Sequence, residues 1–176
     1  MILNPTPTKQ NRKLLKKLYQ TAFPRSEKKP YLLIERKCRE GSMERMAIEE
    51  DGQFLGLAIT ILHKDIVLLD YFAVSPESRG KGIGSAILKE LTVRYPGKRI
   101  LLEIEDPEEP SKNREDRLRR KAFYLRNGLT VQDYKVWLFG VKMLVLTLGG
   151  SVAFEEYHET YAEVFTSAIQ KRIKKA

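Results

Sequence analysis

The stretch DYFAVSPESRGKGIGSAILKEL, residues 70–91, decides the fold of this chain. An apolar run comes first, three alternating glycines follow, and the stretch ends in apolar residues at helical spacing. Glycine costs conformational entropy on folding. Three glycines between a strand and a helix therefore indicate that a backbone without side chains is needed there. The first turn of a helix has unpaired N–H groups and the positive end of the helix dipole, which suit this turn to a phosphate.

Two common phosphate-binding motifs fit this turn poorly. A P-loop requires Ser or Thr after Gly80-Lys81, where this chain has Gly82. The dinucleotide-binding fingerprint requires a glycine at the position of Ser85. On these residues alone, a glycine-rich turn without any ligand also stays open.

Apolar periodicity on either side of the turn predicts alternating helices and strands. Helices are expected over 8–23, 30–41, 82–95, 111–127 and about 154–173. Strands are expected over 43–50, 54–63, 66–74, 99–105, 129–139 and 141–148. Runs of strands mixed with single crossovers predict an α/β (α+β) fold, with a mixed, mostly antiparallel central sheet flanked by helices on both faces.

Length and composition are those of a single globular domain over residues 1–176, of which 42% are hydrophobic. Cys38 is the only cysteine, so no intramolecular disulfide can form. The N-terminus lacks the apolar segment of a signal peptide. The most apolar stretch, 136–148, is shorter than the ~20 residues of a membrane span. We therefore expect a cytoplasmic protein without a membrane partner.

The net charge of +9 suits an anionic partner, whether nucleic acid, an acidic membrane or a phosphorylated cofactor. Cations gather around 9–17, 112–126 and 171–175, whereas the segment 103–109 is acidic. Because aromatic residues do not alternate with the cations and no nucleic-acid-binding motif is present, we expect no nucleic acid partner. His63 and His158 have no partners at metal-ligand spacing, so we expect no metal site.

Two motifs, in the right order, resemble those of the GNAT superfamily of N-acetyltransferases. Arg79-x-x-Gly82-x-Gly84 resembles motif A of that family. The segment RKAFYLRNGL, residues 120–129, resembles a second family segment through Phe123, Tyr124 and Gly128. The predicted element order is also GNAT-like, apart from the terminal helix. The resemblance implies an enzyme that transfers an acetyl group from acetyl-CoA, its cosubstrate, to a primary amine by direct attack in a ternary complex.

The resemblance also implies how acetyl-CoA binds. Backbone N–H groups of the turn would hold the pyrophosphate, and the preceding strand end would pair with the pantetheine arm. The implied turn residues are Arg79, Gly80, Lys81, Gly82, Ile83, Gly84 and Ser85. The implied strand residues are Phe72, Ala73 and Val74. Arg117 and Arg120 stand where many members carry Asn and Ala, so these arginines either reach the cofactor phosphates or face solvent.

Acetyl transfer to an amine requires a proton acceptor and a group that stabilises the leaving thiolate. An alkyl ammonium of pKa ~10.4 must lose a proton before it attacks, and a carboxylate can relay that proton through water. Glu103 is the first candidate for this base and Asp70 the second; Glu105 shares a strand face with Glu103 but is expected to be solvated. Tyr124 matches the tyrosine that the family uses as a donor to the departing sulfur.

The acceptor is less well defined than the donor. The acidic segment 103–109 favours a cationic acceptor such as a polyamine, an aminoglycoside, or the amine of a peptide or protein. An alternative hypothesis is a non-catalytic acyl-CoA-binding sensor or regulatory subunit with the same fold. The apolar strands 129–148 and the final helix would suit either a homodimer surface or the completion of the core.

Overall fold

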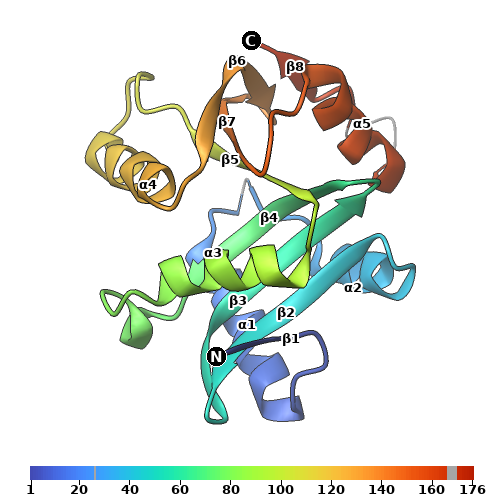
Figure 1. Cartoon of the computed structure of the whole chain (residues 1–176), viewed down its shortest axis with the longest axis vertical. Coiled ribbons are helices and arrows are strands. Elements are labelled where there is room, and N and C mark those ends of the chain that lie inside the picture. The colour runs from blue at the N-terminus through green and yellow to red at the C-terminus, as the bar shows by residue number, and fades with distance from the viewer. Residues whose placement is uncertain (26, 166–169) are drawn as a thin grey trace. The chain divides into compact units, whose positions relative to one another are not determined.

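A computed structural model describes residues 1–25, 27–165 and 170–176, and the chain divides into two compact units (Figure 1). Unit 1 comprises Met1–Leu62 and Leu69–Pro96, and unit 2 comprises His63–Leu68 and Gly97–Ala176. The strand β4, Ile66–Val74, contributes residues to both units. The prediction of one domain over 1–176 stays a prediction.

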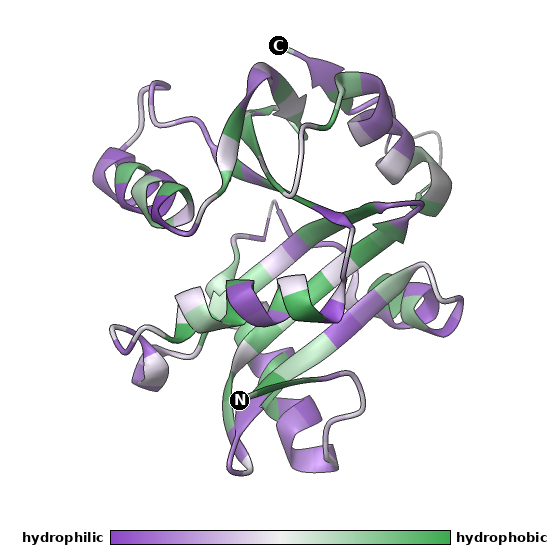
Figure 2. Cartoon of the chain, viewed as in Figure 1, coloured by the Kyte–Doolittle hydropathy of each residue, from purple (hydrophilic) through white to green (hydrophobic). Residues whose placement is uncertain are grey.

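Unit 1 packs helices on both faces of its strands. Its elements are β1 (Ile2–Asn4), α1 (Lys9–Ala22), α2 (Tyr31–Arg39), β2 (Met43–Glu50), β3 (Gln53–His63), the second part of β4, and α3 (Ile83–Arg94). In Figure 1, α3 lies in front of these strands, and α1 and α2 lie behind them. Every residue of β3 from Leu55 to Ile61 is buried, which is typical of a strand covered on both faces. Figure 2 shows these strands as mainly hydrophobic and the outer turns of α1 as hydrophilic.

The sequence did not predict β1. This short strand pairs antiparallel with β2, with Ile2 opposite Glu49. A buried polar contact fixes it, because the Glu49 carboxylate accepts hydrogen bonds from Asn4 Nδ2 at 2.9 Å and from Asn11 Nδ2 at 2.8 Å. Since this contact joins β1, α1 and β2 across long sequence separations, local apolar periodicity does not reveal it.

Unit 2 is built on the remaining strands. Its elements are the start of β4, β5 (Arg99–Glu105), α4 (Arg114–Arg126), β6 (Thr130–Leu138), β7 (Val141–Leu148), α5 (Phe154–Val164) and β8 (Ile173–Lys175). β5 pairs in parallel with Ile66–Leu68 of β4 and antiparallel with β7. Hydrogen-bonded neighbours follow the order β1-β2-β3-β4-β5-β7-β6-β8, which confirms the predicted mixed, mostly antiparallel sheet.

The terminal helix is shorter than the predicted 154–173. α5 ends at Val164, and β8 begins at Ile173, opposite Leu138 of β6. The prediction ran too far because β8 is defined by its pairing with the distant strand β6, which helical periodicity does not reveal. The predicted apolar positions Ala168 and Ile169 lie outside the described residues. In the part of the chain that the structure describes, no helix has the length and apolar character to cross a bilayer.

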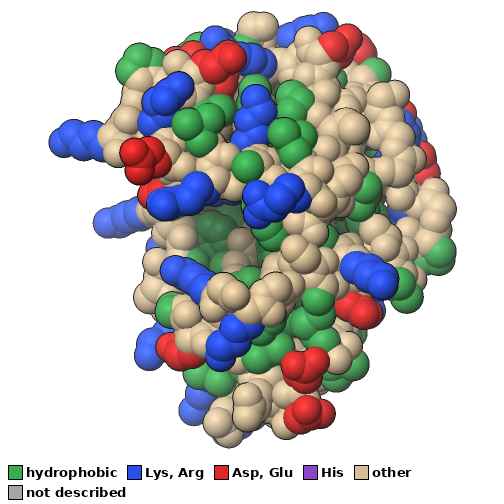
Figure 3. All heavy atoms as spheres, turned by 60° about the vertical axis from the view of Figure 1, so that its left-hand side comes forward, with side chains coloured by type: hydrophobic (Ala, Val, Ile, Leu, Met, Phe, Trp, Pro, Cys, Tyr) green, Lys and Arg blue, Asp and Glu red, His purple; other side chains and the backbone are tan. Residues whose placement is uncertain are grey.

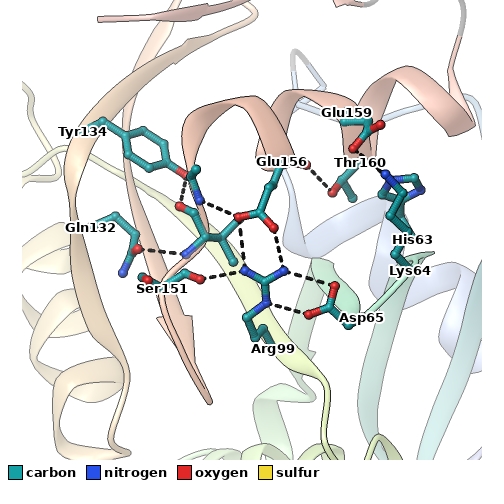
Figure 4. A network of polar contacts seen from close by, with 12 residues as sticks. His63, Lys64, Asp65, Arg99, Gln132, Tyr134, Ser151, Glu156, Glu159 and Thr160 are labelled. Carbon is teal, nitrogen blue, oxygen red and sulfur yellow. Dashed lines mark hydrogen bonds and ion pairs between the residues drawn. The ribbon is translucent and has the colours of Figure 1, made fainter.

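A polar network around Arg99 holds α5 to the strands of unit 2 (Figure 4). The guanidinium donates to Asp65 at 2.8 and 3.0 Å, to Glu156 at 2.7 and 3.1 Å, and to the Ser151 carbonyl oxygen at 2.8 Å. These hydrogen bonds, first to Glu156 and then to Asp65, raise the pKa of Arg99 above its usual range. The Glu156 carboxylate also accepts from the Ala153 N–H at 2.9 Å, so it caps the start of α5. The network therefore fixes the helix that reaches the candidate base described below.

Candidate active site

The glycine-rich turn joins β4 to α3 within unit 1. The short 3-10 helix η1, Pro76–Ser78, follows β4, and Gly82 is the N-cap of α3. Gly80 and Gly82 have φ angles of +75° and +74°. L-residues with a side chain rarely adopt this left-handed conformation, so the path of the backbone requires glycine at both positions.

The turn presents unused backbone donors. Within the described residues, the N–H groups of Gly82, Ile83 and Gly84 make no hydrogen bond to the chain, whereas Ser85 donates to the Gly82 carbonyl oxygen at 3.1 Å. Arg79 and Lys81 are exposed, and Arg79 Nε donates to the Val74 carbonyl oxygen at 3.3 Å. Free N–H groups at the start of a helix suit phosphate oxygens. The N–H groups of Arg79 and Ser85 are already used within the chain, by the carbonyl oxygens of Pro76 and Gly82, so the predicted role of the turn rests on Gly82, Ile83 and Gly84 and stays a prediction.

The end of β4 lies directly against β3. Ser75 donates its N–H to the Leu55 carbonyl oxygen at 2.8 Å, and a Cβ on Gly56 would lie only 2.4 Å from the Ala73 carbonyl oxygen. This close approach fixes one edge of the segment Phe72–Val74. The parallel pairing of β4 with β5 covers Ile66–Leu68, and Phe72–Val74 follow farther along the strand.

Asp70, the second candidate base, is the counter-ion of a buried lysine. Its carboxylate oxygens accept from Lys29 Nζ at 2.6 and 2.9 Å, and the side chains of Lys29 and Asp70 are only 8% and 4% exposed. The Lys29 ammonium also lies over the Tyr71 ring, 5.1 Å from its centroid. Abstraction of a substrate proton by Asp70 would first have to disrupt this pair, so a catalytic role for Asp70 stays a prediction.

Tyr124 lies in unit 2 and is the buried residue of α4. Its ring packs edge-on against Phe123, with 5.1 Å between centroids. Burial raises the pKa of Tyr124 to about 12, against a smaller lowering by the charge of Arg120. The hydroxyl therefore keeps its proton at neutral pH and is suited to donating a hydrogen bond.

The chain leaves α4 through a Schellman motif just beyond Tyr124. Gly128 has a φ of +86°, its N–H donates to the Leu125 carbonyl oxygen at 3.1 Å, and the Leu129 N–H donates to the Tyr124 carbonyl oxygen at 3.2 Å. Leu129 is itself buried. The second motif of the sequence is thus a helix C-cap that fixes the backbone of Tyr124.

Glu103, the first candidate base, is held by the terminal helix. The Tyr161 hydroxyl of α5 donates to Glu103 Oε1 at 2.8 Å, and Tyr161 is fully buried. Tyr134 lies close to the same carboxylate: burial and then the charge of Glu103 raise the pKa of Tyr134 above its usual range. Sequence reasoning missed Tyr161 as a site residue, because its apolar spacing predicted a helix face but not which strand the face covers.

Arg117 and Arg120 are engaged within unit 2. Arg117 pairs with Glu105 at 2.7 Å and donates to the Asp106 carbonyl oxygen at 3.0 Å, and Arg120 lies 3.4 Å from Glu105. Only 11% of the Arg117 side chain is exposed. The sequence left two roles open for Arg117, a contact with the cofactor phosphates or exposure to solvent. Arg117 has neither role and instead joins α4 to the end of β5.

The rest of the acidic segment is also compensated by neighbouring cations. Asp106 and Glu108 lie 2.8 and 2.5 Å from Lys135 Nζ, and Glu109 lies 3.0 Å from Lys142. Burial acts to raise the pKa of Asp106, but the hydrogen bonds from Lys135 and the Glu108 N–H and the charges of Lys135 and Lys142 together outweigh it, and the pKa is lowered. These pairs remove the main reason for expecting a cationic acceptor.

Figure 3 shows Lys and Arg side chains spread over one face of the molecule with Asp and Glu between them.

The potential metal ligands are dispersed in the part of the chain that the structure describes. Among the described residues, no group of three or more His, Cys, Asp or Glu side chains is arranged to hold a metal ion. His63 instead lies 3.5 Å from Glu159 of α5 (Figure 4).

Comparison with known proteins gives a family match. A family model described as "Acetyltransferase (GNAT) family" matches residues 10–128. No curated protein matches the chain. Among solved structures, the chain is similar to a protein from Bacteroides thetaiotaomicron described as an acetyltransferase from the GNAT family. The TM-score is 0.77 at 23% identity, over 97% of this chain and 99% of that one.

Two further structures carry more specific descriptions. One is a GNAT family acetyltransferase from Elizabethkingia anophelis with acetyl-CoA bound, with a TM-score of 0.51 and 15% identity over 68% of this chain and 82% of that one. The other is a chimera of the spermidine N-acetyltransferase SpeG from Vibrio cholerae and hSSAT, with a TM-score of 0.62 and 13% identity over 84% and 96%. At these identities the likeness concerns the fold.

Proposed function

The chain belongs to the GNAT family of acetyltransferases, and we propose that it transfers an acetyl group from acetyl-CoA to a primary amine. The observation that carries the proposal is the turn after β4, with two left-handed glycines and the unused N–H groups of Gly82, Ile83 and Gly84. These donors, with the exposed cations Arg79 and Lys81, would hold the pyrophosphate. The backbone of Phe72, Ala73 and Val74 would pair with the pantetheine arm.

The acceptor must lose a proton before it reacts. Deprotonating an alkyl ammonium of pKa ~10.4 at neutral pH costs roughly 4.6 kcal/mol. We assign Glu103 to accept this proton through water, because a weakly basic carboxylate relays a proton more readily than it retains one. The hydrogen bond from Tyr161 supports this assignment, since it orients the Glu103 carboxylate.

Acetyl-CoA, when bound, supplies a thioester whose acyl carbon bonds to the amine nitrogen while its bond to sulfur breaks. We assign Tyr124 to donate a hydrogen bond to the sulfur as negative charge builds on it. Full proton transfer from a hydroxyl whose pKa is about 12 to a thiolate of ordinary pKa ~8.5 would be uphill by about 5 kcal/mol. A hydrogen bond that strengthens toward the transition state avoids this cost.

The acceptor is proposed only as a primary amine. A polyamine, an aminoglycoside, and a peptide or protein amine remain candidates, and the description of one structural neighbour as a spermidine N-acetyltransferase supports including polyamines in a test. The charge compensation of segment 103–109 gives no preference for a cationic acceptor. The proposal includes a cytoplasmic location, in keeping with the single cysteine.

Substitution of Gly82 tests the binding role of the turn. We expect Gly82→Ala to weaken CoA binding about tenfold, because a side chain at a left-handed position costs roughly 1–2 kcal/mol and shifts the turn toward another conformation. Isothermal titration with CoA measures this change.

Gly52 provides a matched control. It has a φ of +78° in the β2–β3 hairpin, and a Cβ there, as at Gly82, would meet open space. Gly52→Ala should therefore cost similar strain and leave CoA affinity unchanged. Equal CoA affinity for both variants and the unmodified protein would show that the turn is not the binding site.

A further inference from the structure

The first helix carries a row of cations on its exposed face. Its basic residues recur at i, i+3, i+4, i+7 and i+8, a spacing that places them on one side of a helix. We call these residues the basic stripe: Lys9, Arg12, Lys13, Lys16 and Lys17, all exposed. The opposite side of α1 is buried through Leu15, Leu18 and Tyr19.

The charges of the basic stripe are not compensated by ion pairs within residues 1–25, 27–165 and 170–176. α1 contains no acidic residue, and within the described parts of the chain no ion pair joins an acidic group to a stripe residue. The one aromatic contact is that of Lys16, whose Nζ lies 5.2 Å from the centroid of Tyr31. The acidic segment 103–109 is different, since Glu105, Asp106, Glu108 and Glu109 all form ion pairs.

The basic stripe does not stabilise the helix that carries it. Like charges four residues apart, such as Lys9 and Lys13 or Lys13 and Lys17, repel each other. Lys9 and Arg12 also lie at the helix N-terminus, where the dipole favours anions. Thr8 caps this end by accepting from the Asn11 N–H at 3.2 Å, which offsets part of the cost. A charge pattern that opposes helix stability points to a role in binding.

We propose that the basic stripe binds the phosphate backbone of a nucleic acid duplex. Five cations spaced over about 12 Å of helix axis, at ~1.5 Å per residue, meet a duplex segment with about seven phosphate charges. Backbone binding of this kind needs cations only and carries no base sequence preference. The inference goes beyond the proposed acetyl transfer and does not depend on it.

Other anionic partners fit the basic stripe less well. A membrane-surface helix inserts an apolar face into lipid, but the apolar side of α1 is already buried against the protein. Protein interfaces have an apolar core depleted of charge, and the stripe is flanked by Leu14 alone, which is 37% exposed. Single strands are held by stacking on exposed aromatic residues, and none lies among the stripe residues.

The proposed duplex binding departs from the sequence expectation of no nucleic acid partner. That expectation rested on the lack of aromatic residues between the cations and on the lack of a recognised motif. Binding to the phosphate backbone requires neither of them. The arrangement that matters is the alignment of cations on one exposed helix face, with no ion pair to any of them among the described residues.

Fluorescence anisotropy with a labelled DNA duplex of about 20 base pairs tests the proposal. If all five cations contact phosphates, a plot of the logarithm of the binding constant against the logarithm of salt concentration should have a slope near −4.5. The binding constant should then fall about 500-fold between ~50 and ~200 mM salt. The triple variant Lys9→Gln, Lys13→Gln, Lys16→Gln should reduce the slope to about −1.8. Its melting temperature should be equal or higher, because like-charge repulsion is relieved.

A triple variant with the same charge change elsewhere is the control. Lys89, Lys112 and Arg114 are exposed, and Lys89→Gln, Lys112→Gln, Arg114→Gln should keep the slope of the unmodified protein. Saturating CoA should also leave duplex binding unchanged. The proposal is overturned if no duplex binds at ~50 mM salt, if both triple variants lose affinity equally, if CoA displaces the duplex, or if poly-glutamate binds as tightly as the duplex, which would indicate an acidic protein partner.

Discussion

Replacing Lys29 with alanine is expected to lower the free energy of unfolding by about 3–5 kcal/mol. The substitution leaves the carboxylate of Asp70, which is 4% exposed, without its ion-pair partner. Native domains are stable by about 5–15 kcal/mol, so this loss would bring the protein close to unfolding. Urea denaturation followed by circular dichroism measures it directly.

The neighbouring lysine gives the control. Lys28 Nζ donates to the Gln20 carbonyl oxygen at 2.6 Å in an exposed contact, so Lys28→Ala should cost less than about 1 kcal/mol. The double variant Lys29→Met, Asp70→Asn removes both charges and should recover much of the stability lost in Lys29→Ala. A loss below about 1 kcal/mol for Lys29→Ala would show that Asp70 is not a buried counter-ion and would restore it as a candidate base.

Replacing Tyr124 with phenylalanine is expected to lower kcat about 100-fold, at the low end of acid–base effects, with CoA affinity unchanged. The hydroxyl is assigned to the departing sulfur, so its loss affects the transition state and not the bound ground state. Stability should change little, because in the parts of the chain that the structure describes the Tyr124 hydroxyl makes no hydrogen bond. Steady-state release of CoA thiol, with CoA titration and thermal melting, measures these quantities.

A second tyrosine separates loss of a hydroxyl from loss of catalysis. The Tyr95 hydroxyl of unit 1 donates to Glu44 Oε2 at 2.7 Å, so Tyr95→Phe should cost about 1.5–3 kcal/mol of stability. Its kcat should stay within a few-fold of the unmodified enzyme. If Tyr124→Phe retains full kcat, Tyr124 has no part in the reaction.

Local sequence signals predicted the elements around the turn accurately. β2, β4 and β5 have the predicted bounds, and α3 begins directly after Gly82, because glycines and turn residues mark these boundaries. The turn between β2 and β3 has the same local character: Asp-Gly is a strong hairpin signal, and Asp51 and Gly52 have φ angles of +50° and +78°. Short edge strands such as β1 and β8 were missed, because their pairing depends on distant residues and not on their own pattern.

The candidate site also has features that the sequence predicts and features that it does not. The glycines at 80 and 82 and the cap at Gly128 follow from local backbone requirements, so their motifs could be read directly. The partners of the candidate bases could not be predicted, because Lys29 and Tyr161 lie 41 and 58 residues from the carboxylates that they contact. Such contacts depend on how the helices pack on the sheet, which no local spacing encodes.

The central claim, catalysis of acetyl transfer, is tested most directly by one assay of CoA thiol release. The protein is incubated with acetyl-CoA and, separately, with spermidine, an aminoglycoside, a lysine-containing peptide and a peptide with a free N-terminus. We expect amine-dependent release with at least one acceptor, lowered about 100-fold in Tyr124→Phe. Tight CoA binding without release above the amine-free rate for any acceptor would contradict it and identify a non-catalytic acyl-CoA-binding protein.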